Sequence, residues 1–167
     1  MRKLLLVVTC LFLMQASLSA HELNEQGRFG LGAVIGYPGL GLSLNGFVAD
    51  DISIETNVMG RFYYVSGLHL DVDLLFWMHE SDFRPLTVTW FVGPGASIMY
   101  VSAINRTYYG GAYYSGLLGG PKGSIGLALL FNDAPVDFSI KLSPGLLIGS
   151  NGIVPWAEFL LASRFYF

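Results

Sequence analysis

Acidic and imidazole side chains occupy alternate positions of one segment, at His69, Asp71 and Asp73. Alternate residues of a β-strand point to the same face, so these groups would share one surface. A histidine beside a carboxylate can act in acid–base catalysis, and the same groups could contribute metal ligands. Catalysis would also need a nucleophile such as Ser43 or Ser53, and no spacing places either beside His69. We therefore expect no catalytic residue, metal site or cofactor, and assign His69 to a buried hydrogen-bonded network.

A second pattern, Gly30, Gly32 and Gly36, imitates the glycine spacing of a nucleotide-binding loop. That chemistry needs a strand before the glycines and a helix after them, and no helical segment follows here. We expect these glycines to relieve crowding inside a narrow sheet structure instead.

The composition narrows the protein class. Of 167 residues, 53% are hydrophobic and 13% are charged, whereas a soluble domain of this size carries about 25% charged residues. Outside residues 4–14 there is no apolar run of the roughly 20 residues that a spanning helix needs. The formal charge of −3, without a basic stripe, argues against nucleic-acid binding. A single cysteine excludes a disulfide framework.

The first residues are typical of an export signal. Arg2 and Lys3 precede the apolar core at 4–14, and a run of small residues ends at Ala20. We expect a signal peptide at 1–20 and one mature domain at 21–167. Cys10 leaves a lipoprotein alternative open. Removal of the signal leaves 7 Lys and Arg against 12 Asp and Glu.

The mature chain divides into eight segments that alternate between apolar and polar or small residues. In the seventh, Val136, Phe138 and Ile140 oppose Asp137 and Ser139, which is the pattern of a strand with two different faces. A helix over residues 86–105 is the alternative to a strand there, but Gly93-Pro94-Gly95 would weaken it. The expected strand spans are 27–36, 40–49, 51–63, 67–78, 86–101, 120–132, 136–148 and 155–167.

Three features place the polar face inside. Its residues are mostly small, as the interior of an eight-stranded barrel requires. Its charges balance, five basic against five acidic, and enclosed charges need partners. Aromatic side chains gather near the ends of the apolar face, as in the girdles of membrane barrels. We predict a lumenal charge network formed by Arg28, Glu55, Arg61, His69, Asp71, Asp73, Lys122, Asp137, Lys141, Glu158 and Arg164.

The predicted fold class is therefore all-β, an eight-stranded antiparallel up-and-down transmembrane β-barrel. Segments of this length can cross a bilayer, because about 9–11 tilted residues suffice. A closed barrel also satisfies every backbone group in lipid.

The last nine residues, Phe159 to Phe167, resemble the C-terminal strand of bacterial outer-membrane β-barrels, with alternating apolar residues before a terminal phenylalanine. The resemblance implies that the barrel-assembly machinery recognises Phe165 and Phe167. The whole mature chain resembles the eight-stranded OmpA-type transmembrane domain. More narrowly, it resembles a spirochaetal family of small barrels of unknown function, in residues 29–32, 36–43, 68–71, 144–146 and 164–167. These resemblances imply a fold and an outer-membrane location, and no activity.

One long connection stands apart from the alternation, the tyrosine-rich stretch 106–116. Tyrosine and glycine together form adaptable contact surfaces in binding loops. The stretch is either a strand extension above the membrane or a contact site for an extracellular or host protein. The candidate contact residues are Arg106, Tyr108, Tyr109, Tyr113 and Tyr114.

These observations predict a non-enzymatic integral outer-membrane protein with a plugged polar lumen and a structural or surface-interaction role. Its expected partners are outer-membrane lipids and the assembly machinery. Two alternatives stay open: a narrow pore or solute transporter, and a soluble periplasmic lipocalin-like carrier.

Overall fold

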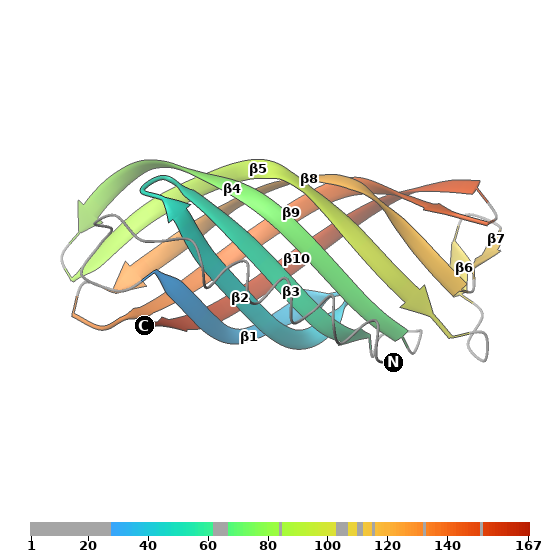
Figure 1. Ribbon diagram of the computed structural model, residues 1–167, viewed down its shortest axis with the longest axis horizontal. Helices are drawn as coiled ribbons and strands as arrows, with labels where there is room; N and C mark the ends of the chain where they lie inside the picture. Colours follow the sequence, from blue (N-terminus) through green and yellow to red (C-terminus); the bar gives the residue numbers. More distant parts are fainter. Residues whose placement is uncertain are drawn as a thin grey trace.

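A computed structural model describes residues 28–61, 67–83, 85–102, 107–109, 112–114, 116–131, 133–150 and 152–167. Eight strands form a closed antiparallel barrel in the order β1-β10-β9-β8-β5-β4-β3-β2, and β6 and β7 form a separate hairpin (Figure 1). This confirms the predicted eight-stranded antiparallel barrel. The strands are β1 (Phe29–Tyr37), β2 (Gly39–Ala49), β3 (Ile52–Arg61), β4 (Gly67–Phe83), β5 (Leu86–Val101), β6 (Thr107–Tyr109), β7 (Ala112–Tyr114), β8 (Gly116–Phe131), β9 (Val136–Gly149) and β10 (Gly152–Tyr166).

The predicted segments differ from the barrel strands at two connections. The turn expected at 79–85 is largely strand, because β4 continues to Phe83 beyond a register shift between Trp77 and Glu80. Such a bulge lets a ladder continue with an extra residue on one side. The stretch expected as one loop at 102–119 contains the β6–β7 hairpin and the start of β8. The predicted signal peptide lies outside the described residues. Within the residues that are described, no helix is long and apolar enough to cross a membrane.

The strand register tilts the barrel. From Gly30, successive register partners lead through Asn45, Glu55, Asp73, Gly95, Lys122 and Gly145 to Trp156. Gly30 itself faces Tyr166, ten residues beyond Trp156. A stagger of this kind tilts the strands by about 35–45° and leaves an eight-stranded interior that side chains fill.

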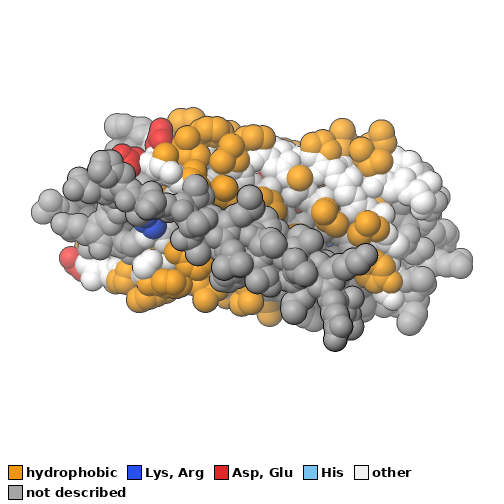
Figure 2. Space-filling view, viewed as in Figure 1, with side chains coloured by type: hydrophobic (Ala, Val, Ile, Leu, Met, Phe, Trp, Pro, Cys, Tyr) orange, Lys and Arg blue, Asp and Glu red, His pale blue; other side chains and the backbone are white. Residues whose placement is uncertain are grey.

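Polar side chains point inward and large apolar ones point outward along most of the wall. On β9, Phe138 and Ile140 are each 48% exposed, whereas Asp137 and Lys141 are at most 2% exposed. Figure 2 shows hydrophobic side chains along the wall, with the visible acidic side chains gathered at one end. The predicted assignment of the two faces therefore holds in the structure.

The interior also holds apolar layers that the alternation did not predict. We call the end with Arg28 and Phe167 the terminal end, and the end with β6 and β7 the hairpin end. Near the terminal end Leu75, Trp77, Phe91 and Ala128 pack with Phe47. Near the hairpin end Met99, Val101, Leu118, Leu147 and Trp156 pack with Tyr37. Apolar layers thus lie on both sides of the polar centre.

Glycine makes room for one of these layers. A Cβ added at Gly126 would lie 2.3 Å from Phe91 Cζ and 2.4 Å from the Ile140 carbonyl oxygen. Overpacking of this kind costs about 1–3 kcal/mol. We expect Gly126→Ala to lower the denaturation midpoint of the barrel in detergent. Gly123→Ala on the same strand is the matched control, since its Cβ would meet nothing within 4 Å. Equal midpoints for the two variants would contradict this packing.

Candidate functional site

The predicted network residues come from six stretches of the chain. The inward positions of five barrel strands supply all of them except Arg28, which precedes β1 and is half-buried. The other ten are at most 6% exposed. They are Glu55 and Arg61 on β3, His69, Asp71 and Asp73 on β4, Lys122 on β8, Asp137 and Lys141 on β9, and Glu158 and Arg164 on β10.

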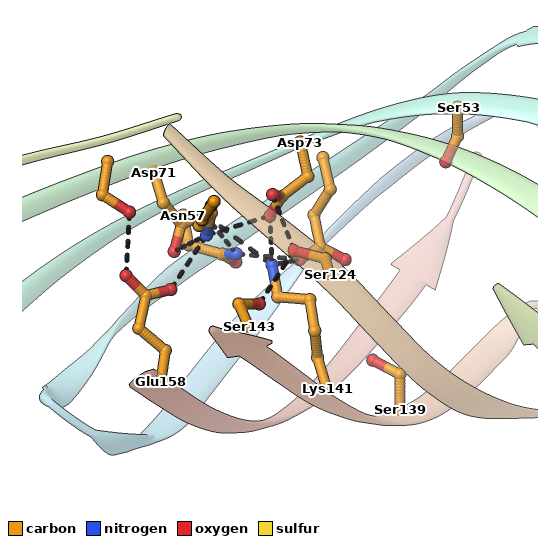
Figure 3. A network of polar contacts seen from close by, with 12 residues as sticks. Ser53, Asn57, Asp71, Asp73, Ser124, Ser139, Lys141, Ser143 and Glu158 are labelled. Carbon is orange, nitrogen blue, oxygen red and sulfur yellow. Dashed lines mark hydrogen bonds and ion pairs between the residues drawn. The ribbon is translucent and has the colours of Figure 1, made fainter. Parts of the chain in front are cut away.

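Two lysine ammonium groups hold the middle of this network together (Figure 3). Lys122 Nζ lies 2.8 Å from Glu158 Oε2 and 3.1 Å from Asp73 Oδ2. Lys141 Nζ pairs with the same Asp73 oxygen and with Glu55 Oε1. Asp73 therefore links β8 to β9 across the interior, and its other oxygen accepts a hydrogen bond from Ser124.

Arg164 is the largest fully buried side chain and forms a second centre. Its Nε lies 3.1 Å from both oxygens of Asp137, and its Nη2 donates to Ser139 Oγ at 2.8 Å. Its Nη1 pairs with Glu55, which also binds Lys141. Buried ions are tolerated when paired and hydrogen-bonded in this way. Glu55 thus joins the two centres into one network.

Uncharged polar residues complete the network, although they are not among its predicted members. Tyr166 donates to Asp137 at 2.8 Å and accepts from Asn45 Nδ2 at 3.0 Å. Asn57 Nδ2 donates to Glu55 at 2.8 Å and to Asp71 at 2.9 Å. Their positions on the polar faces of their strands were the available signal.

His69 lies beside carboxylates but not beside a predicted nucleophile. Its Nε2 is 2.9 Å from Glu158 Oε1 and 3.8 Å from Asp71 Oδ2, and its Nδ1 has no hydrogen-bond partner among the described residues. Ser53 accepts a hydrogen bond from Trp77 at 2.8 Å, and Ser43 Oγ has no partner among the residues described. The fold therefore places His69 in the charge network.

Two groups of three side chains have metal-ligand spacing: His69, Asp71 and Glu158, and Glu55, Asp71 and Asp73. Lys122 lies within 3.3 Å of oxygens of Asp71 and Glu158 in the first group. Lys141 Nζ forms ion pairs with Glu55 and Asp73 of the second group and lies 3.7 Å from Oδ1 of Asp71. The lysine ammonium groups thus supply the positive charge that a metal ion would bring.

The predicted balance of five basic and five acidic residues applied to the whole polar face and did not say which residues meet at the centre. The five acids lie at the centre, and among the described residues Lys122, Lys141, Arg164 and His69 form ion pairs with them. Arg61 instead ends β3, where its guanidinium lies 5.3 Å from the centre of the Trp156 ring and beside Met99. Arg28 lies at the terminal end, before β1. Alternation predicts the face on which a residue lies, and not its height along the barrel.

The tyrosine-rich contact residues lie at the hairpin end, away from the C-terminus (Figure 1). In the β6–β7 ladder Tyr108 faces Tyr113, Tyr109 faces Ala112, and Thr107 faces Tyr114. Arg106 lies outside the described residues. The stretch predicted as a contact loop therefore contains a short hairpin.

The predicted assembly signal lies where the last strand closes the barrel. Phe165 and Phe167 are 53% and 64% exposed on the outer surface. The Phe167 amide donates to the Phe29 carbonyl at 3.0 Å, and the two rings meet edge to face at 5.3 Å. Phe167 thus continues the β1–β10 ladder to its end.

Neither a protein-family model nor a curated protein matches this sequence. Among solved structures, the chain is similar to the N-terminal β-barrel domain of Pseudomonas aeruginosa OprF, with a TM-score of 0.58 and 12% sequence identity. The match covers 83% of this chain and 94% of that domain. The similarity shows that the two chains share the fold of an OmpA-type eight-stranded barrel.

Proposed function

We propose that this chain is a non-enzymatic, integral outer-membrane β-barrel protein with a structural or surface-contact role. The observation that carries this proposal is the inverted placement of side chains, with charges buried inside and large apolar residues exposed outside. A barrel in water would place its charges on the outside. A barrel in lipid shows the arrangement seen here, because lipid faces the apolar band.

We further propose export through a signal peptide and assembly in the outer membrane. We assign 1–20 to a signal peptide and 21–167 to the barrel, with outer-membrane lipids and the barrel-assembly machinery as partners. The eight-stranded barrel fold, which this chain shares with the OprF domain, supports an outer-membrane location. The narrower resemblance to the spirochaetal small-barrel family stays a prediction, and it implies no activity.

Fractionation of cells that produce the full chain tests this proposal. We expect the mature protein in the outer-membrane fraction, soluble only in detergent, with a heat-modifiable shift on gels. Recovery in the soluble fraction without detergent would support a lipocalin-like carrier instead and would overturn the proposal.

The interior arrangement favours a plugged lumen over a pore. The ion-paired centre is filled by charged side chains, and the Trp77 and Trp156 layers lie on either side of it. An eight-stranded barrel generally fills its own interior. We expect purified protein in planar bilayers to give no steady single-channel conductance, with a large porin as positive control. Steady conductance would favour the pore or transporter alternative.

We also propose that the tyrosine-rich stretch 106–116 is exposed at the cell surface and contacts an extracellular or host protein. The support is the place of the β6–β7 hairpin at the end of the barrel opposite the C-terminus (Figure 1). Protease added to intact cells should cut within 106–116 and leave the barrel uncut. A stretch that is cut only after the outer membrane is permeabilised would contradict this orientation.

A further inference from the structure

Two prolines interrupt the same seam of the barrel wall. The β8–β9 register is continuous from Ile125↔Leu142 to Leu130↔Asp137, but beyond Ile125 it reduces to the isolated pairs Lys122↔Gly145 and Gly119↔Ile148. The pairs on either side of each gap share one register, and continuing that register places Pro121 opposite Leu146 and Pro144 opposite Gly123. Proline has no N–H to donate to a ladder, so each of these pairs lacks one donor.

The outer surface over this gap combines two prolines and a glycine with two large apolar residues, Leu146 and Ile148, which are 45% and 52% exposed. Pro121, Gly123 and Pro144 are exposed, and a Cβ at Gly123 would meet nothing within 4 Å. On the continuous half of the seam, Ile125 and Leu142 are 49% and 47% exposed and cover the backbone. In lipid no water is available to donate the hydrogen bonds that the two prolines cannot donate. The carbonyl groups left without a donor therefore cost free energy in the membrane.

Side chains inside the barrel close the gap. Ser124 and Ser143 lie on neighbouring strands at the interruption, and their hydroxyls are 2.8 Å apart. Ser124 also donates to Asp73 Oδ1 at 2.8 Å (Figure 3). Lys122 Nζ lies 2.8 Å from Glu158 Oε2. Side-chain contacts of the lumenal charge network therefore supplement the interrupted backbone ladder at this seam.

We infer that the barrel wall opens laterally at the β8–β9 seam, at 119–124 and 143–148, which is closed in this structure. Such an opening would connect the lipid phase with the part of the network formed by Lys122, Ser124 and Ser143. Separation of the two strands at this seam breaks few backbone hydrogen bonds. The inward side chains of Lys122, Ser124 and Ser143 can then form hydrogen bonds with a molecule that enters from the lipid. The inference rests on the proposed membrane location.

Amide hydrogen exchange of the unaltered protein in lipid nanodiscs tests the opening. We expect amides at 119–124 and 143–148 to exchange at least about tenfold faster than those at 126–130 and 137–141 of the same two strands, because exchange follows local opening. Uniform exchange along both strands would overturn the inference. Failure of the protein to enter the membrane fraction would instead contradict the proposed function, so the two failures are distinguishable.

Restoring the missing donors provides a second test. The double variant Pro121→Val and Pro144→Val can complete both pairs, and we expect it to slow exchange at the seam to the rate of the 126–130 stretch. Pro155→Val is the matched control, since the β9–β10 register runs without interruption past Pro155. An equal effect of the control and the double variant would overturn the inference.

Access from lipid can be measured with two inward serines of β9. Ser143 and Ser139 are 0% and 5% exposed, and only Ser143 lies at the interruption. In single-cysteine variants reconstituted in vesicles, we expect pyrene maleimide to label Ser143→Cys at least about tenfold faster than Ser139→Cys, since local opening precedes labelling. Equal labelling rates would show that the wall is closed at both positions.

Discussion

Arg164→Ala is expected to destabilise the folded barrel by about 3–5 kcal/mol, the usual cost of removing one partner from a buried ion pair. Arg164 is 1% exposed and pairs with Asp137 at 2.9 Å and with Glu55. Its loss leaves Asp137 with the Tyr166 hydroxyl and Glu55 with Lys141 and Asn57. Denaturant unfolding of the protein in lipid vesicles measures the change.

Two comparisons make this result specific. Arg28→Ala removes a half-buried arginine at the terminal end and should have a much smaller effect. Asp137→Asn removes the carboxylate charge, so Arg164→Ala should cost less in that background, because residues of one network do not act additively. An unfolding midpoint unchanged by Arg164→Ala would count against the lumenal charge network as a source of stability.

Deletion of Phe167 is expected to reduce the amount of heat-modifiable barrel in the outer membrane severalfold. Two effects act together. The deletion removes the amide that donates to Phe29 and the ring that meets it. It also removes the terminal aromatic residue that the resemblance to outer-membrane barrels assigns to assembly.

Substitutions at the same position separate the two effects. Phe167→Leu keeps the backbone hydrogen bond and loses the aromatic ring, whereas Phe167→Tyr keeps both. If the ring is the assembly signal, Phe167→Leu should resemble the deletion and Phe167→Tyr the unaltered chain. Normal surface levels of the protein without Phe167 would refute the assignment.

Much of the fold could be predicted because alternation is a local property of the chain. In β9, Asp137, Ser139 and Lys141 share a face whatever the other strands do, because successive side chains of a strand point to opposite faces. The same local rule placed ten of the eleven network residues on inward positions of strands. It could not extend to the β6–β7 hairpin, where tyrosine and glycine residues dominate the sequence and no apolar alternation is present.

By itself, the sequence determined the strand count, the inward face of each strand and the presence of enclosed charges of both signs. Only the tertiary structure decided which charges meet. Lys141 and Glu55 are 86 residues apart and pair because the staggered register brings β3 and β9 to one height in the barrel. It also placed Trp77 and Trp156 inside, moved Arg61 away from the centre and set Pro121 and Pro144 on one seam. These outcomes depend on register, and register is a relation between strands that no single segment encodes.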